Sequence, residues 1–198
     1  HFAIQNSEYF DRIYCFEPCY PNFLELAKNI FDNDLCKKVA FFNFALFSEV
    51  SMFEFKINTK ASPYGSSLYQ YDGQENDATH RTFSICLEKL FDLINEKTVH
   101  FLKCDIEGAE YELFYGSYLK NIDIISMELH QGILGRIDDP GSKSRALVNY
   151  ILSQNFYLVC PEYELDETSK TLSFKKTPKT NDEWLFCNAN PSCDIKYD

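Results

Sequence analysis

Residues 99–110 read VHFLKCDIEGAE and carry the pattern that decides the fold. Residues 99–104 form a short, mostly apolar run, as expected of a buried strand. Three acids and a glycine follow directly, at Asp105, Glu107, Gly108 and Glu110. Glycine permits a tight turn from strand to helix, and an acid in the first helical turn interacts favourably with the helix dipole. The stretch therefore predicts a strand, a tight turn and a helix.

Strand and helix patterns alternate on both sides of this stretch. Apolar runs predict strands at 12–16, 39–47, 51–57, 82–87, 122–129 and 156–160. Apolar residues at helical spacing predict helices at 21–31, 88–95 and 144–154. The order is that of an α/β protein, and 198 residues suit one domain. We therefore predict a single domain over 1–198, with one Rossmann-like, mostly parallel sheet and helices on both of its faces.

Composition and charge limit the partners and the compartment. The chain is 45% hydrophobic, and its net charge of -11 disfavours nucleic acid as a partner. No apolar run approaches the roughly 18 residues of a membrane span, so we expect none. The eight cysteines include no Cys-x-x-Cys pair. They are expected to be free thiols, which predicts a cytoplasmic protein.

Ligands of open parallel sheets bind at the carboxyl ends of the strands, so the candidate residues are sought there. Four predicted ends carry acidic or polar groups: Glu17, residues 43–46, residues 105–110, and Glu128 with His130. Glu17 stands between a strand and a helix, where a carboxylate can accept both hydroxyls of a ribose. The same residue, with Pro18 and Pro21 beside it, could instead serve as an ordinary charge at the start of the helix.

Asp105, Glu128 and His130 form the second candidate group. Glu128 and His130 are two residues apart and share one side of a strand, and Asp105 lies at the end of a strand expected nearby. The group could take a proton from a hydroxyl, or it could hold a divalent cation through oxygen ligands. It could also be a surface histidine beside a helix-capping aspartate.

A long stretch without periodicity, residues 58–81, interrupts the pattern. It contains Pro63, Gly65 and Gly73. A loop of this length in a compact domain is usually a lid or a binding loop. We take Tyr64 and Ser66 within it as candidate substrate-binding residues, although the loop tyrosines could equally be ordinary packing.

The motifs together resemble the FkbM-type S-adenosylmethionine-dependent methyltransferases. The similarity runs from about Ile13 to His130 and rests on four segments: 16–18 with Asn22 and Leu26, 45–46, 102–110 and 128–130. The block Lys-x-Asp-x-Glu-Gly-x-Glu at 103–110 is its most specific part. The resemblance implies a class I methyltransferase fold with an antiparallel last strand, which we expect at 183–188.

The resemblance also implies residue roles. S-adenosylmethionine would be held by Glu17 at its ribose, with Pro18, and by Ala45 and Leu46 near the adenine. Asp105 would bind the cofactor as well, at its methyl donor end, and would also face the acceptor. Glu128 and His130 would lie around it, with Glu107 and Glu110 on the substrate side. A hydroxyl of a sugar, glycan or related small molecule is the acceptor implied.

One family feature is missing from this sequence. The family pattern begins with a strand and a glycine-rich turn, yet the first glycine here is Gly65. We therefore expect the chain to be an amino-terminal truncation that lacks the first strand. Two other functions stay open: a binding or structural protein that kept the fold without the cofactor, and a metal-dependent enzyme that uses the same carboxylates.

Overall fold

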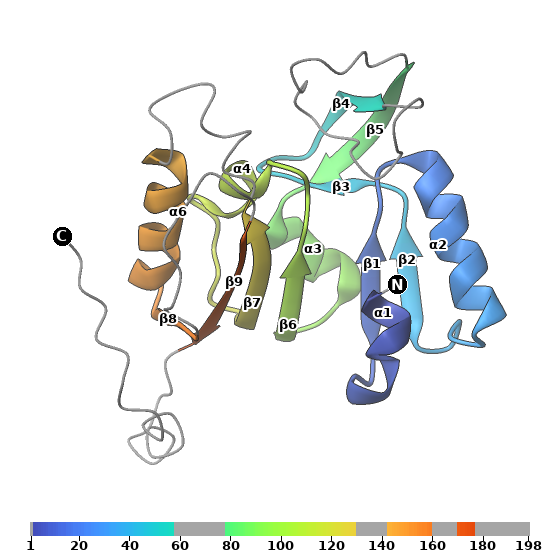
Figure 1. Cartoon of the computed structure of the whole chain (residues 1–198), viewed down its shortest axis with the longest axis horizontal. Helices are drawn as coiled ribbons and strands as arrows, with labels where there is room; N and C mark the ends of the chain where they lie inside the picture. Colours follow the sequence, from blue (N-terminus) through green and yellow to red (C-terminus); the bar gives the residue numbers. More distant parts are fainter. Residues whose placement is uncertain (1, 58–77, 130–141, 160–169, 177–198) are drawn as a thin grey trace. The chain divides into compact units, whose positions relative to one another are not determined.

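The computed structural model describes residues 2–57, 78–129, 142–159 and 170–176. The chain divides into two compact units, 1–96 with 107–113, and 97–106 with 114–198. Each unit combines helices with strands (Figure 1), so the predicted mixed α/β class is confirmed. The described strands form three hydrogen-bonded sheets of two, three and four strands, whereas the sequence predicted one.

The first sheet belongs to unit 1 and consists of two parallel strands. Helix α1 (Phe2–Gln5) and a 3-10 turn (Ser7–Tyr9) lead into β1 (Ile13–Phe16), and β2 (Val39–Phe42) pairs with it from Ile13 opposite Val39 to Phe16 opposite Phe42. In the chain, α2 (Tyr20–Asp32) connects β1 to β2, and it has a proline in its first turn. Proline suits this position because its missing N–H has no helical partner there.

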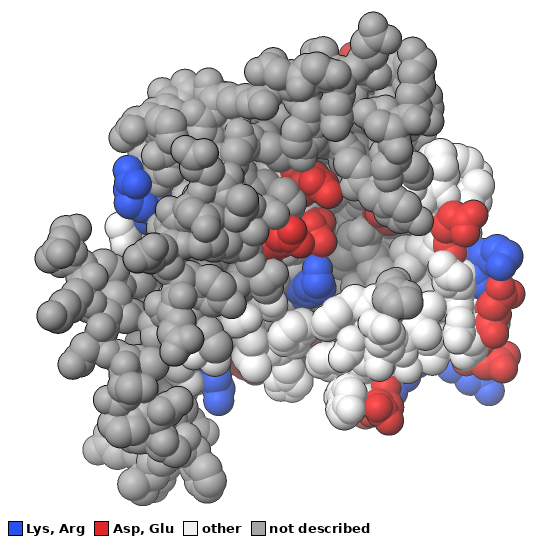
Figure 2. Space-filling model, viewed as in Figure 1, with Lys and Arg blue, Asp and Glu red and all other residues white. Residues whose placement is uncertain are grey.

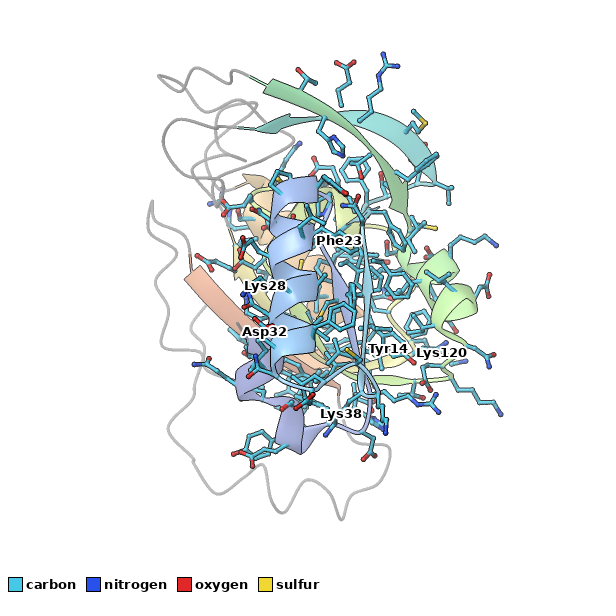
Figure 3. The ribbon with its side chains drawn as sticks, turned by 90° about the vertical axis from the view of Figure 1, so that its right-hand side faces the viewer. Tyr14, Phe23, Lys28, Asp32, Lys38 and Lys120 are labelled. Atoms are coloured by element: carbon cyan, nitrogen blue, oxygen red, sulfur yellow. The ribbon has the colours of Figure 1, made fainter. Side chains whose placement is uncertain are left out.

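Helix α2 has an aromatic side and a charged side. The Phe23 and Phe31 rings lie 5.7 and 6.2 Å from the Phe41 ring of β2. Lys28 and Asp32 pair across one turn at 2.7 Å on the exposed side (Figure 3). Acidic and basic side chains also alternate along the right-hand edge of Figure 2, where α2 lies. The helix therefore covers β2 with aromatic rings and presents mixed charge to solvent.

The second sheet of unit 1 has the order β3-β5-β4. It contains β3 (Ala45–Leu46), β4 (Ser51–Ile57) and β5 (Ala78–Ile85), and α3 (Leu87–Ile94) follows. The sequence predicted one strand over 39–47, but the chain leaves the first sheet after Phe42 and joins the second at Ala45. This prediction was wrong because an apolar run does not show which neighbour each residue pairs with.

The third sheet lies in unit 2 and has the order β6-β7-β9-β8. Its strands are β6 (Val99–Cys104), β7 (Ile122–Leu129), β8 (Phe156–Leu158) and β9 (Lys170–Lys176). Helix α4 (Glu110–Phe114) follows β6 at the boundary of the units, and α6 (Ser142–Ser153) precedes β8. Fully buried side chains form the core of this unit: Leu119, Ile125, Met127, Leu129, Leu147, Ile151 and Phe174.

Parallel and antiparallel pairs are equally frequent among the described strands. Three pairs are parallel, β1-β2, β3-β5 and β6-β7, and three are antiparallel, β4-β5, β7-β9 and β8-β9. The described part of the chain is thus less parallel than predicted, because β4 and β9 return beside neighbouring strands. The strand expected at 183–188 lies outside the described residues.

For free cysteines and for the absence of a membrane span, the structure bears on the described residues alone. Five cysteines lie among the described residues, Cys15, Cys19, Cys36, Cys86 and Cys104, and each is a free thiol. None of the described helices has the length and apolar character needed to cross a bilayer.

Candidate functional site at the strand ends

The turn after β1 is tied to the end of β2 in unit 1. Glu17 continues the parallel pairing, since its N–H donates to the Phe42 carbonyl at 3.0 Å. Asn43, the first residue after β2, donates from Nδ2 to the carbonyls of Glu17 and Pro18, at 2.9 and 3.2 Å. The side chain of Asn43 thus satisfies two backbone acceptors of the turn, and the turn is held against the strand end that the sequence also singled out.

The carboxylate of Glu17 is half-buried and has two neutral donors. Its Oε1 accepts the backbone N–H of Cys19 at 2.8 Å, and the Asn22 side chain also bonds it. Burial is the largest influence and raises the pKa of Glu17, while the two hydrogen bonds oppose the rise. Cys19 immediately precedes α2, so this carboxylate supports the start of the helix. Both sequence-based interpretations of Glu17, as a helix-start charge and as the ribose ligand, stay predictions.

Aromatic and apolar groups surround the same strand ends. The Phe16 ring stacks on Phe42 at 5.2 Å, and Phe44 lies 5.5 and 5.4 Å from these two rings. Ala45 is buried and Leu46 half-buried, and both pair with β5. Unit 1 therefore contains all four residues: Glu17 and Pro18 follow β1, and Ala45 and Leu46 form β3 shortly after the end of β2.

Asp105 and Glu128 stand at neighbouring positions in unit 2. Strands β6 and β7 are parallel, and Cys104 is paired with Met127. Asp105 follows Cys104, and Glu128 follows Met127. Neighbouring parallel residues point to the same face, which puts the two carboxylates on one side. Asp105 is exposed and lies 3.3 Å from the Lys103 ammonium, whereas Glu128 is half-buried. His130, Tyr64 and Ser66 lie outside the described residues.

The other two acids lie in the turn after Ile106 and at the start of the helix that follows it. Glu107 has a φ of +53° and Gly108 a φ of +99°, and glycine adopts the left-handed region without steric cost. Glu110 is completely buried, and its Oε1 accepts the Gly108 N–H at 3.2 Å. Its place at the start of α4 is the structural role that the sequence indicated. A substrate role for Glu107 and Glu110 stays a prediction.

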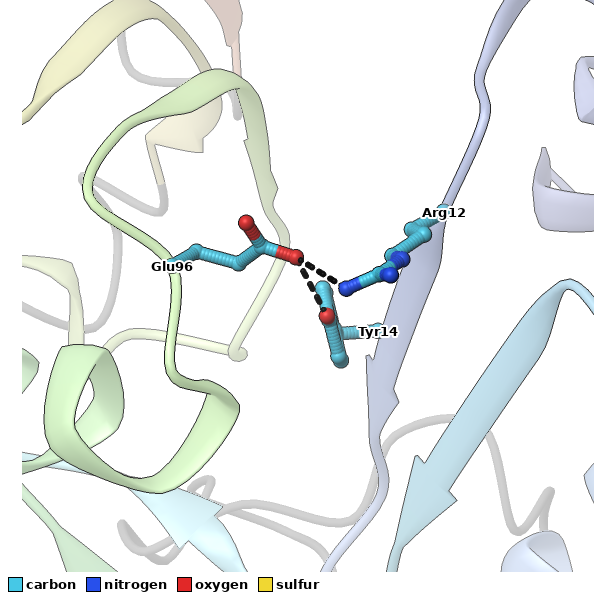
Figure 4. A network of polar contacts seen from close by, with 3 residues as sticks. All are labelled: Arg12, Tyr14 and Glu96. Atoms are coloured by element: carbon cyan, nitrogen blue, oxygen red, sulfur yellow. Dashed lines mark hydrogen bonds and ion pairs between the residues drawn. The ribbon is translucent and has the colours of Figure 1, made fainter.

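One polar network in unit 1 was not predicted. The Glu96 Oε1 accepts the Tyr14 hydroxyl at 2.8 Å and the Arg12 guanidinium at 3.1 Å (Figure 4). The Tyr14 hydrogen bond, followed by the interaction with Arg12, lowers the pKa of Glu96. Glu96 lies 82 residues from Tyr14 in the chain, so no local pattern could have indicated the contact.

A metal ion needs several ligating side chains close together. Within the described residues, no three His, Cys, Asp or Glu side chains lie together as a metal ion would require. Since His130 is outside that part of the chain, the divalent-cation alternative stays a prediction.

The fold and these strand ends define a mixed α/β protein whose candidate binding groups follow parallel strands, where ligands of such sheets bind. A family model described as the Methyltransferase FkbM domain matches residues 2–158. The chain belongs to the FkbM methyltransferase family, and this membership supports methyl transfer as its general activity. Neither the curated proteins nor the solved structures include a significant match.

Proposed function

We propose that this chain is an S-adenosylmethionine-dependent O-methyltransferase with a Rossmann-like class I fold. Its acceptor is a hydroxyl of a sugar, glycan or related small molecule. The observation that carries the proposal is the half-buried carboxylate of Glu17 at the carboxyl end of β1, held by Cys19 and Asn22. Family membership supplies the reaction class.

The residues of unit 1 fit the nucleoside part of S-adenosylmethionine. A ribose offers two hydroxyl donors, and an ionised carboxylate accepts both without donating. The apolar side chains of Ala45, Leu46 and Phe44 suit a planar base. Glu17 would hold the ribose, with Pro18 beside it, and Ala45 and Leu46 would contact the base. When bound, S-adenosylmethionine would supply the methyl group.

The acceptor hydroxyl requires help from the protein because it is far too weak an acid to ionise at neutral pH. We assign Asp105, Glu128 and His130 to this task, with His130 as the general base and the two carboxylates orienting it. The parallel pairing of β6 with β7 supports the assignment by bringing Asp105 and Glu128 to adjacent positions. Glu107, Glu110, Tyr64 and Ser66 are the residues proposed to contact the acceptor.

Calorimetric titration of the chain with S-adenosylmethionine and with its demethylated product tests the cofactor assignment. We expect saturable heat with both compounds and a higher melting temperature in their presence, because a ligand that binds only the folded state stabilises it. No heat and no melting shift would contradict the proposal and favour a binding or structural protein that kept the fold. A response to divalent ions alone would favour a metal-dependent enzyme.

Substitutions at the proposed base test the reaction. With an authentic hydroxyl acceptor, His130→Ala is expected to lower turnover by roughly 10² to 10⁴ while cofactor affinity stays near that of the wild type. Asp105→Asn should also lower turnover. As a control, Asp123→Asn alters an exposed carboxylate of β7 that pairs with His100 at 2.7 Å, and it should keep full activity. Full turnover of both His130→Ala and Asp105→Asn would remove the assignment.

A further inference from the structure

The outer face of the antiparallel pair β4–β5 has an inverted polarity. Met52 lies directly opposite Phe83, and the two side chains are 56% and 61% exposed. On the other face of β5, Thr82 and Ser84 are buried. A sheet with one solvated face normally buries its apolar residues and exposes its polar ones. Here the apolar pair faces outward and the hydroxyls face inward.

The buried hydroxyl of Ser84 is satisfied, which explains why the inner face tolerates it. Ser84 Oγ donates to the Glu49 carbonyl at 2.8 Å and lies 3.1 Å from Ser51 Oγ. On the same strand, the His80 ring stacks with Tyr20 of α2 at 6.4 Å. The inner face therefore packs against other residues of unit 1. A shift of strand register that buried Met52 and Phe83 would break these contacts.

Charges of both signs stand beside the apolar pair. Glu54 lies opposite Arg81, two residues along from Met52 and Phe83, so all four side chains share the outer face. Glu54 Oε1 and Arg81 Nε are 3.5 Å apart, and both side chains are well exposed. Val50, which precedes the strand, is 60% exposed as well. Among its described side chains, the face thus combines an apolar pair with an acid and a base that lie opposite each other.

We propose that this face binds the same face of a second copy of the chain. A two-fold axis that runs along the strands, midway between β4 and β5, places β4 of one protomer over β5 of its partner. Met52 then meets the partner's Phe83, and Glu54 meets the partner's Arg81. Each contact occurs twice, as in any isologous interface. The face is therefore complementary to itself in both polarity and charge.

The charge pattern favours a second copy over a lipid surface. The chain carries a net charge of -11, which opposes binding to anionic lipids. Two strands offer a small interface, so the dimer should dissociate on dilution. Screening of the overall negative charge at physiological ionic strength should favour association. A dimer formed through this face would require no methyl-transfer activity.

Sedimentation velocity over a concentration series tests the dimer. We expect the wild type to reach twice the mass of one chain and Phe83→Ser to remain monomeric. Phe31→Ser is the matched control, because Phe31 of α2 is also 61% exposed, and it should dimerise like the wild type. A wild type that stays monomeric, or a Phe83→Ser chain that dimerises equally well, would overturn the proposal. Sedimentation of the monomer with anionic phospholipid vesicles would also overturn it.

Charge reversal tests the geometry of the pairing. Glu54→Arg makes both members of the Glu54–Arg81 pair basic, and Arg81→Glu makes both acidic, so each variant alone should dimerise about tenfold more weakly or worse. An equimolar mixture of the two should recover the dimer, because the basic face of one chain meets the acidic face of the other. Asp32→Lys in the exposed pair of α2 is the control and should change nothing. Failure of the mixture to associate would overturn the proposal, and unchanged circular dichroism would establish that each variant is folded.

Discussion

Two glutamates lie near opposite ends of β1, and their side chains have different hydrogen-bond partners. Glu17 follows the last residue of the strand, is half-buried, and is bonded by the backbone N–H of Cys19 and the amide of Asn22. Glu96 bonds Tyr14 within the strand and Arg12 just before it. Burial raises the pKa of Glu17, whereas the Tyr14 hydrogen bond lowers that of Glu96.

The difference separates a carboxylate suited to binding from one that only supports the fold. The negative charge of Glu96 is stabilised by a cation and a hydroxyl of this chain, so its role is complete without a ligand. Among the described residues, the donors to Glu17 are neutral, and its charge bears a desolvation cost. Hydroxyl donors of a ligand would stabilise that charge further, which is why we place the ribose there.

Loss of the Glu17 carboxylate is expected to have the largest effect on cofactor affinity. Glu17→Ala should raise the dissociation constant for S-adenosylhomocysteine by roughly 5- to 150-fold, equivalent to ~1–3 kcal/mol, because the ribose hydroxyls lose their acceptor. Isothermal titration calorimetry measures the change. Glu96→Ala serves as the control and should bind like the wild type. Equal affinities for the two variants would erase the distinction between the two ends of β1.

Asn43→Ala should act in the same direction with a smaller effect. It removes two hydrogen bonds that hold the turn containing Glu17. We expect a loss of unfolding free energy of about 1 kcal/mol and a several-fold weaker cofactor affinity. The matched control is Asn33→Ala. It removes a hydrogen bond of 2.8 Å from the Asn33 side-chain amide to the Asn29 carbonyl, at the exposed end of α2. If both variants kept full affinity, the turn would not position Glu17 for the ligand.

The pH dependence of stability should differ in sign between the two glutamates. With its raised pKa, Glu17 binds a proton more tightly in the folded state than in the unfolded one. Relative to Glu17→Gln, the wild type should therefore lose stability as pH rises from about 4.3, the ordinary value, through the folded-state pKa. Glu96 is the reverse case: relative to Glu96→Gln, the wild type should lose stability as pH falls below about 4.3 through the lowered pKa.

Urea denaturation of the three proteins at a series of pH values measures both slopes. The glutamine variants keep a carbonyl acceptor of similar size, so the comparison isolates the titrating charge. The effect at Glu96 should be small, because the Arg12 side chain is 72% exposed and solvent screens the pair. Slopes of the same sign for both residues would contradict the contrast.

Several elements were predictable because their signals are local. The apolar runs at 99–104 and 122–129 coincide with β6 and β7, and the acid–glycine turn leads to α4 as expected. Glu17 and the residues after position 42 were singled out because ligand-binding residues follow parallel strands. These inferences need only periodicity, turn chemistry and the direction of the chain.

The sequence alone determined an α/β chain of the FkbM type, with its carboxylates at strand ends. Only the tertiary structure decided that the run 39–47 divides between two sheets, that Glu96 binds Tyr14, and that Met52 and Phe83 point outward while Ser84 is buried. The physical reason is the same in each case. Burial, pairing and charge stabilisation depend on neighbours far away in the chain, and a pattern of single residues does not specify which neighbours those are.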